Sequence, residues 1–389
     1  MELHQLINGR VITPDGILSR GSILWTDGII RSVSTDCTPA PGAHVIDVEG
    51  CYIAPGCIDM HIHGGDGHDF MEATPEAFDA IRYAHALHGT TSLLATLAVS
   101  PRSTIERCVE ICDRNLSRGE GAQLLGLHLE GNYINPLYKG AQDPTYITDP
   151  DPEEYTTLLG QTTCIRRWSA APELPGATDF ARFASLRGVL VSLAHTAGDA
   201  QDVQKGYQAG FTHATHFYNA MSGVHKEGVY KHEGTIESVL VNDGITIELI
   251  ADGIHVPPTL LRLAWKVKGT SGTSLVTDAM SASAPVGADA ADRVFDPRTI
   301  VEDGVCKMAD RSALAGSIAT FDRLIRTMVQ QADIPLVDAV RMASDTPACI
   351  LGIEDRKGAL TEGKDADIIV FDDDIHIHYT IISGNLLHR

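Results

Sequence analysis

Two histidines separated by a single residue, His61 and His63, stand in the apolar segment IDMHIHG at positions 58–64. On a β-strand, residues i and i+2 point to the same face, so a strand here places the two imidazoles side by side. Imidazole is a common ligand of zinc and iron, and two imidazoles on one strand can share an ion. The segment therefore predicts a metal-binding strand.

Other polar residues close apolar runs of strand length further along the chain, and they could belong to the same centre. Imidazole and carboxylate ligands together suit Zn or Fe(II), and three protein ligands with one open position make a catalytic site. We expect Glu130, His195 and His216 to hold a divalent ion. Asp278 is then the candidate general acid/base, because a metal lowers the pKa of its water and a nearby carboxylate can take the proton. Taken singly, each of these residues could instead cap a helix or hydrogen-bond a loop.

Two further features could contact a substrate. His255 follows an apolar run on a glycine-containing turn, where it could polarise a carbonyl group or serve only the structure. The segment VHKEGVYKHEG at 224–234 carries His225, Lys226, Lys231 and His232 within an acidic chain. An anionic substrate such as a sugar phosphate needs a local basic group because the overall field repels it. A solvated charged loop is the alternative.

The elements that must position these residues alternate between strand-like and helix-like patterns. The helix-like stretches are 75–88, 103–117, 200–209 and 258–268. The strand-like stretches are 57–63, 90–97, 124–130, 165–171, 189–195, 211–216, 245–251 and 273–278. Such an alternation favours an α/β fold, a (β/α)8 TIM barrel whose chemistry lies at the carboxyl ends of the strands. The candidate ligands fall at those ends.

Both ends of the chain read as short strands broken by turns. We expect residues 1–54 and 356–389 to form one small β-sandwich domain and residues 55–355 to form the barrel. The chain has 389 residues, a formal net charge of −21 and a pI of about 5.1, which argues against nucleic acid or an anionic membrane as partner. The eight cysteines form no CxxC pair, and we find neither a signal segment nor an apolar run of membrane-spanning length. We expect a reduced, cytoplasmic protein.

Several motifs resemble those of known enzymes. APGCIDMHIHG at 54–64 resembles the opening motif of the amidohydrolase superfamily, and KDADIIVF at 364–371 resembles its closing strand. Five more segments resemble the family of N-acetylglucosamine-6-phosphate deacetylases: HLEG (128–131), KGA (139–141), THFYNAM (215–221), IADGIH (250–255) and LAGS (314–317). Together these motifs extend over nearly the whole chain.

The resemblance implies hydrolysis of the N-acetyl group of an amino-sugar 6-phosphate. It implies metal ligation by Glu130, His195 and His216, acid/base catalysis by Asp278, and contact of His255 with substrate and oxyanion. It also implies one or two divalent ions per chain (zinc, or iron, manganese or cobalt) and a homodimer in which the basic loop serves the neighbour's site. The sugar site would be lined by Ala141, Gln142, Asn219, Ala220, Leu314, Ala315, Gly316 and Ser317.

The chain departs from the family pattern at three places. Asn132 follows HLEG where many members have proline, and Lys231 is the nearest equivalent of the family's phosphate-binding arginine. Lysine offers a point charge in place of the guanidinium fork. Members with a single metal lack the full His-x-His, whereas His61 and His63 are both present here, so we expect a second ion beside them.

The alternatives to this function are other enzymatic activities and a non-catalytic role. The substrate could be N-acetylgalactosamine 6-phosphate or an unphosphorylated N-acetyl sugar. A cyclic-amide hydrolase or an aminoacyl deacylase is disfavoured, because many of these use a carboxylated lysine on the fourth strand and 164–173 contains no lysine. A non-catalytic barrel is disfavoured because no candidate ligand is missing.

Overall fold

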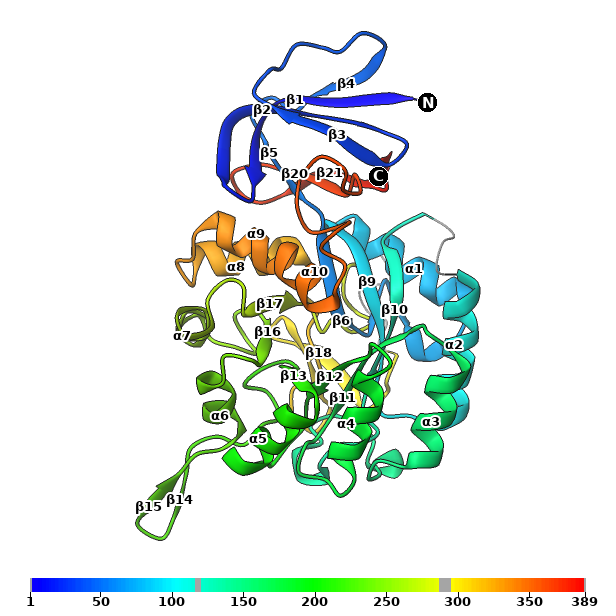
Figure 1. Ribbon diagram of the computed structural model, residues 1–389, viewed down its shortest axis with the longest axis vertical. Helices are drawn as coiled ribbons and strands as arrows, with labels where there is room; N and C mark the ends of the chain where they lie inside the picture. The colour runs from blue at the N-terminus through cyan, green and yellow to red at the C-terminus, as the bar shows by residue number, and fades with distance from the viewer. Residues whose placement is uncertain (1, 116–119, 287–294, 388–389) are drawn as a thin grey trace.

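The computed structural model describes residues 2–115, 120–286 and 295–387. Figure 1 shows a β part, built from both chain termini, lying on one end of a larger barrel of strands and helices. Within the described residues, no helix combines the length and apolarity needed to cross a membrane. All eight cysteines are free thiols.

The terminal part is one mixed eight-stranded sheet. Strand β20 from the C-terminus pairs antiparallel with β5 from the N-terminal segment, with Ile369 opposite Ala54. Trp25 and Ile53 are among the buried residues of its separate apolar core. The predicted boundaries of this domain at residues 54 and 356 stay a prediction. The strands are β1 (Leu3–Thr13), β2 (Gly16–Thr26), β3 (Ile29–Ser34), β4 (Ala43–Asp47), β5 (Tyr52–Pro55), β20 (Ile368–Phe371), β21 (Ile377–Ile382) and β22 (Asn385–Leu386).

The larger part is the predicted barrel of eight parallel strands. Each strand pairs with the next along the chain, and the circle closes where the Asp278 N–H, just beyond the last strand, donates to the His61 carbonyl at 2.8 Å. The predicted ranges agree with the observed strands to within three residues at each end. The strands are β6 (Cys57–Ile62), β9 (Thr90–Leu97), β10 (Gln123–Glu130), β11 (Ile165–Ala170), β12 (Leu190–Leu193), β13 (Phe211–Ala214), β16 (Thr246–Ile250) and β17 (Thr273–Val276).

Helices lie around the outside of the barrel (Figure 1), and apolar side chains of strands and helices form one buried cluster. The four helices predicted from periodicity are present as α1, α2, α5 and α7, and positions 116–117 of the predicted helix 103–117 lie outside the described residues. Helix α3 also had a start signal in its sequence, since Asp151 caps it by accepting from the Glu153 N–H and proline follows at the first helical position. The helices are α1 (Pro75–Ala86), α2 (Arg102–Asn115), α3 (Pro152–Gln161), α4 (Ala177–Ser185), α5 (Ala200–Ala209), α6 (Thr235–Val241), α7 (Pro258–Lys268), α8 (Phe321–Gln330), α9 (Leu336–Ala343) and α10 (Asp345–Leu351).

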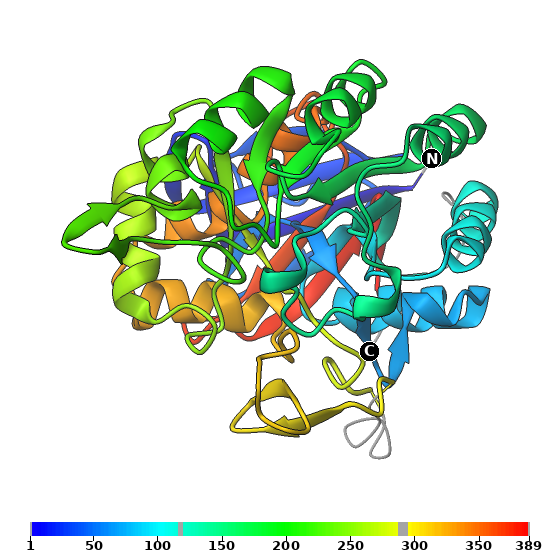
Figure 2. The same cartoon turned by 90° about the horizontal axis from the view of Figure 1, so that it is seen from below.

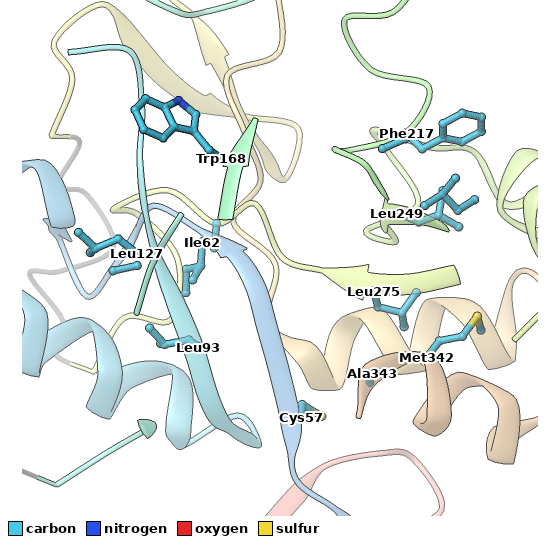
Figure 3. Close-up of a cluster of buried hydrophobic side chains, with 14 of the residues drawn as sticks. Cys57, Ile62, Leu93, Leu127, Trp168, Phe217, Leu249, Leu275, Met342 and Ala343 are labelled. Atoms are coloured by element: carbon cyan, nitrogen blue, oxygen red, sulfur yellow. The ribbon is translucent and has the colours of Figure 1, made fainter. Parts of the chain in front are cut away.

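The main core lies between the strands and these helices. Figure 3 shows Leu275 of β17 facing Met342 and Ala343 of α9, and all three side chains are fully buried. Burial of a leucine or methionine side chain stabilises the fold by about 1.5–3 kcal/mol. This packing fixes the strand ends that carry the polar residues.

Short loop elements stand at the carboxyl ends of the barrel strands. Figure 2, which views the molecule from below, shows the hairpins β14–β15 (green) and β18–β19 (gold) on different sides of the molecule. The remaining hairpin and three 3₁₀ helices belong to other loops. Their bounds are β7 (Gly64–Gly65), β8 (His68–Asp69), β14 (His225–Glu227), β15 (Tyr230–His232), β18 (Thr299–Glu302), β19 (Val305–Met308), η1 (Phe70–Glu72), η2 (Pro136–Tyr138) and η3 (Pro144–Tyr146).

The segment after β6 is held by a buried histidine, and this contact makes a prediction for acid stability. His85 of α1 donates from Nε2 to the Gly64 carbonyl at 3.0 Å, and burial lowers its pKa to about 3. An unfolded histidine takes up its proton near pH 6.5. Below that pH the unfolded state binds more protons, so His85 makes stability fall as the pH drops from about 6.5 toward 3.

We expect His85→Gln to reduce this loss. One pKa unit corresponds to about 1.4 kcal/mol, so between pH 7 and pH 5 the wild type should lose roughly 2 kcal/mol more unfolding free energy than the variant. Urea denaturation of both proteins at the two pH values measures the difference. Equal losses would show that His85 is not the responsible group.

Candidate metal centre and active site

Six predicted residues meet at the carboxyl end of the barrel. His61 and Glu130 lie within β6 and β10, and the others follow their strands by one or two residues: His63, His195, His216 and Asp278. All six are buried. In a parallel barrel the carboxyl ends of all strands face one side, which brings residues from distant parts of the chain together.

Glu130, His195 and His216 form the first group of possible metal ligands. Glu130 Oε1 lies 3.0 Å from His195 Nε2 and 2.9 Å from His216 Nε2. His195 Nδ1 lies 2.8 Å from the Tyr138 carbonyl, which can only accept a hydrogen bond. Nδ1 therefore carries the proton in a neutral His195, and Nε2 presents a lone pair to an ion.

His61, His63 and Glu130 form the second group. The other carboxylate oxygen, Glu130 Oε2, lies 3.6 Å from His61 Nε2 and 3.2 Å from His63 Nε2. Asp278 Oδ1 approaches the same two nitrogens at 3.3 and 3.2 Å. Glu130 therefore faces both groups, with one oxygen toward each.

The donor chemistry fits one or two divalent ions. Four imidazole Nε2 atoms converge on Glu130, and the nitrogens of each pair are only 3.1–3.2 Å apart. Two imidazole lone pairs repel at that distance unless a proton or a cation lies between them. Nitrogen and carboxylate ligands of this kind suit zinc and iron. The His-x-His predicted a second ion beside His61 and His63, and this stays a prediction; that Glu130 belongs to both groups was not predicted.

Charge holds the two carboxylates of the centre ionised. Burial alone would raise the pKa of Glu130, but His61, His195 and His216 outweigh burial and hold it well below its usual range. Burial would likewise raise the pKa of Asp278, and His61 and His63 lower it. Ionised carboxylates attract a cation, and an ionised Asp278 can accept a proton.

Three of the six residues have left-handed backbone conformations, which residues other than glycine rarely adopt. The φ angles are 44° at His195, 29° at His216 and 47° at Asp278. Left-handed positions of this kind cost of order 1–3 kcal/mol each and persist where the surrounding structure imposes them. Their concentration in one centre supports a functional role for the centre, and no local sequence signal revealed them.

His255 has an orienting partner that the sequence analysis missed. Asp252 Oδ2 accepts from His255 Nδ1 at 2.8 Å, and Asp252 Oδ1 accepts from the Ile254 and His255 N–H groups at 2.8 Å. His255 Nε2 is buried, has no hydrogen-bond partner among the described residues, and belongs to a side chain that lines the central cavity. The free ring nitrogen therefore suits a substrate contact. The Asp-Gly-x-His spacing could have suggested this pair.

A cavity of about 740 Å³ opens over His63, Glu130, His195, His216 and Asp278, whereas His61 lies beneath them and does not line it. Nearly all the residues predicted to line a sugar site do line it: Ala141, Gln142, Asn219, Ala220, His255, Leu314, Ala315 and Gly316. Ser317 does not line the cavity. It is buried, and its N–H donates to the Asp278 carbonyl at 2.7 Å, so it supports the acid/base segment.

Two amides in this region also hold the structure of the site. Gln142 Nε2 donates to Glu130 Oε2 at 2.8 Å, and its Oε1 accepts from the Val99 N–H. Asn132, which stands where many family members have proline, exchanges two hydrogen bonds with the backbone of Ser100. The departure at Asn132 thus fixes two loops at the rim to each other.

The basic residues at 225–232 lie outside the cavity. Their position argues against a direct contact with a substrate in the cavity of the same chain. Lys231 sits on the β14–β15 hairpin, opposite Lys226, and every residue of both strands is exposed. Figure 1 shows this hairpin projecting away from the barrel. Among the described residues that line the cavity, Arg298 at the entry to β18 is the only lysine or arginine. Arg298 was not among the predicted site residues, because no sequence motif marks it.

Arg298 is held beside the cavity by an acidic neighbour. Its Nε and Nη2 donate to the Asp296 carboxylate at 2.6–3.0 Å. Asp143, which also lines the cavity, is a second negative charge near the guanidinium. The positive charge of Arg298 is therefore largely compensated within the chain.

Comparison with known proteins gives consistent matches over nearly the whole chain. The model of the Amidohydrolase family matches residues 52–387. An N-acetylglucosamine-6-phosphate deacetylase of Bacillus subtilis (strain 168) is 33% identical over 383 residues, covering 97% of this chain and 95% of the relative. An N-acetylgalactosamine-6-phosphate deacetylase of Escherichia coli O157:H7 is 31% identical over 385 residues, covering 98% and 99%.

Solved structures agree with these relatives. The N-acetylglucosamine-6-phosphate deacetylase of Pasteurella multocida superposes with a TM-score of 0.91 at 27% identity, over 100% of both chains. A mutant of the Mycobacterium smegmatis N-acetyl-D-glucosamine-6-phosphate deacetylase, in complex with N-acetyl-D-glucosamine-6-phosphate, superposes with a TM-score of 0.90 at 28% identity, over 99% of both chains.

Proposed function

Because the chain belongs to the amidohydrolase family, we propose that it hydrolyses the N-acetyl group of N-acetyl-D-glucosamine 6-phosphate to acetate and the amino-sugar phosphate. The observation that carries this proposal is the placement of Asp278 and His255 in one cavity with both groups of metal ligands. Two bacterial relatives with this activity match over 95% and 96% of their own length and support the substrate. The product is a free amine that amino-sugar catabolism can use.

The residues divide the work of amide hydrolysis among them. Glu130, His195 and His216 would hold one ion and His61 and His63 a second, with zinc the proposed native metal. A bound ion of this kind acidifies water and polarises a carbonyl group. Asp278 takes the proton of the attacking water and afterwards delivers it to the amide nitrogen, so that the amine leaves neutral.

His255 is proposed to stabilise the charge that develops on the acetyl oxygen. The Asp252 carboxylate, 2.8 Å from Nδ1, fixes the orientation of the His255 ring, and an Nε2–H on this ring would be free to donate to the acetyl oxygen. A preorganised donor at the developing oxyanion is typically worth several kcal/mol. The alternative amidohydrolases that use a carboxylated lysine find no support, since none of the described residues lining the cavity is a lysine.

The test of the function is a panel of four sugars. Metal-loaded protein is incubated with N-acetylglucosamine and N-acetylgalactosamine, each with and without 6-phosphate, and acetate release is measured. We expect the highest kcat/KM for N-acetylglucosamine 6-phosphate. Preference for the galactosamine epimer would identify the second candidate, which the E. coli O157:H7 relative supports. No acetate from any of the four would refute the proposal.

We propose that the 6-phosphate is bound by Lys231 of a second copy of the chain. The support is the exposed position of the basic hairpin and the compensated charge of Arg298 inside the cavity. A homodimer in which the hairpin reaches the neighbour's cavity would bring Lys231 to the substrate.

The free cysteines suit the reducing environment of the cytoplasm, which we propose as the compartment.

Lys231→Ala is expected to raise KM for the phosphorylated sugar and to leave the unphosphorylated sugar nearly unaffected. A lost charge-assisted contact costs about 1.5–3 kcal/mol, or roughly ten- to a hundred-fold in KM. Lys266→Ala, which removes one exposed charge on α7, serves as the control and should change neither value.

Arg298→Ala separates the two possible phosphate contacts. A phosphate-selective rise in KM for this variant, with wild-type behaviour of Lys231→Ala, would assign the phosphate to the cation within the same chain. Equal effects of Lys231→Ala on both sugars would mean that the lysine only supports the hairpin.

A further inference from the structure

A buried ion pair that the sequence analysis did not single out lies directly behind the metal ligands. Glu248 in the middle of β16 and Arg167 in β11 are both fully buried, and Arg167 Nη1 donates to Glu248 Oε2 at 2.5 Å. His213 Nε2 lies 3.2 Å from the same oxygen. Neither member of the pair lines the cavity. Their role must therefore pass through the residues they contact.

The second oxygen of Glu248 contacts two of the metal ligands. Glu248 Oε1 lies 2.8 Å from His61 Nδ1 and accepts from the backbone N–H of His216 at 2.9 Å. An ionised carboxylate can only accept, so the proton of a neutral His61 resides on Nδ1. His61 Nε2 then presents its lone pair toward His63 and Glu130. The tautomer that can bind an ion is thus selected by Glu248.

Arg167 keeps Glu248 ionised and in place. The guanidinium places a permanent positive charge 2.5 Å from the Glu248 carboxylate, which favours its ionised form. Arg167 also donates to the Met60 carbonyl at 3.1 Å and to the Ser192 and Thr215 hydroxyls at 3.0 and 2.9 Å. The guanidinium therefore links the backbone beside His61 to two neighbouring strands. A buried pair with so many bonds holds a defined geometry.

We propose that Glu248, anchored by Arg167, is a positioning residue that orients His61 and thereby sets the affinity of the His61–His63–Glu130 group for its ion. The effect is selective, because Glu248 contacts the imidazole ring of His61 but only the backbone of His216. Partners that orient a metal-bound histidine are worth ten- to a hundred-fold in metal affinity. The inference rests on the metal-dependent function proposed above.

The test measures metal binding directly. Wild type and Glu248→Gln are freed of metal and titrated with Zn²⁺ or Co²⁺ at equilibrium, and the two stepwise affinities are compared. We expect one ion to bind ten- to a hundred-fold more weakly in Glu248→Gln, and the other to change less than about two-fold. Glu173→Gln is the matched control, since Glu173 accepts from the Ala197 N–H and the Thr196 hydroxyl near His195 but touches no ligand ring. That variant should retain both affinities.

A second variant keeps the test decisive if Glu248→Gln does not fold. Glu248→Gln leaves Arg167 as an unpaired buried charge, which can be strongly destabilising. Arg167→Met combined with Glu248→Gln removes both charges, and the same selective loss is expected of it. The proposal would be overturned if a variant bound both ions with wild-type affinity. It would also be overturned if a folded variant lost affinity for both ions equally. Failure of the proposed function would be seen separately. The wild-type protein would then bind metal but release no acetate from any sugar of the panel.

Discussion

Replacing Asp278 by asparagine is expected to lower kcat by about 10²–10⁴-fold while the fold and the ion at Glu130, His195 and His216 are retained. Asparagine has the same shape and tolerates the left-handed φ of 47° at this position, so the backbone should not change. What is lost is the ionised oxygen that lies 3.2 Å from His63 Nε2 and faces the cavity. An amide can neither take the proton of water nor return one to the leaving amine.

Asp69 supplies the control for this prediction. It is the other buried aspartate near His63 that lines the cavity, and burial raises its pKa to about 6. Its Oδ1 caps η1 by accepting from the Met71 N–H. Asp69→Asn should keep most of the turnover, because an amide oxygen can still accept that bond. If Asp278→Asn kept more than about a tenth of wild-type kcat while Asp69→Asn lost it, Asp69 would be the base.

The barrel and the ligand set were predictable because both depend on local pattern. Apolar runs of strand length predicted β6 to β17, and a polar residue at the end of such a run must lie at the carboxyl rim of a barrel. Glu130, His195, His216 and Asp278 follow this rule, and the structure brings them together. No detailed knowledge of side-chain packing was needed for this step.

The contacts behind the ligands were not predictable in the same way. Arg167 and Glu248 are 81 positions apart, and their pairing depends on the register of strands that are not neighbours in the chain. Arg298 lines the cavity from the residue before the β18–β19 hairpin, far in sequence from the other residues of the site. Composition singled out the basic segment with Lys231, but it contained no information about the direction in which that hairpin points, and the role of Lys231 stays a prediction.

Removing both histidines of the His-x-His is expected to remove one ion and keep the other. In His61→Ala/His63→Ala the second group loses its two imidazoles, whereas Glu130 Oε1, His195 and His216 keep their mutual geometry. Elemental analysis and equilibrium titration should show one tight ion per chain where the wild type binds up to two. A double variant that binds as much metal as the wild type would mean that the pair is structural.

Glu130→Ala should behave differently, because the two oxygens of this carboxylate face different groups. Its loss leaves His195 and His216 alone at one position and His61 and His63 with only the nearby Asp278 at the other, and sites with so few ligands bind zinc weakly. We expect both affinities to fall, by at least a hundred-fold for the Glu130–His195–His216 group. The comparison distinguishes one shared centre from two separate sites: if Glu130→Ala weakened only a single ion, the carboxylate would serve one group alone, and the two-ion centre would have to be abandoned.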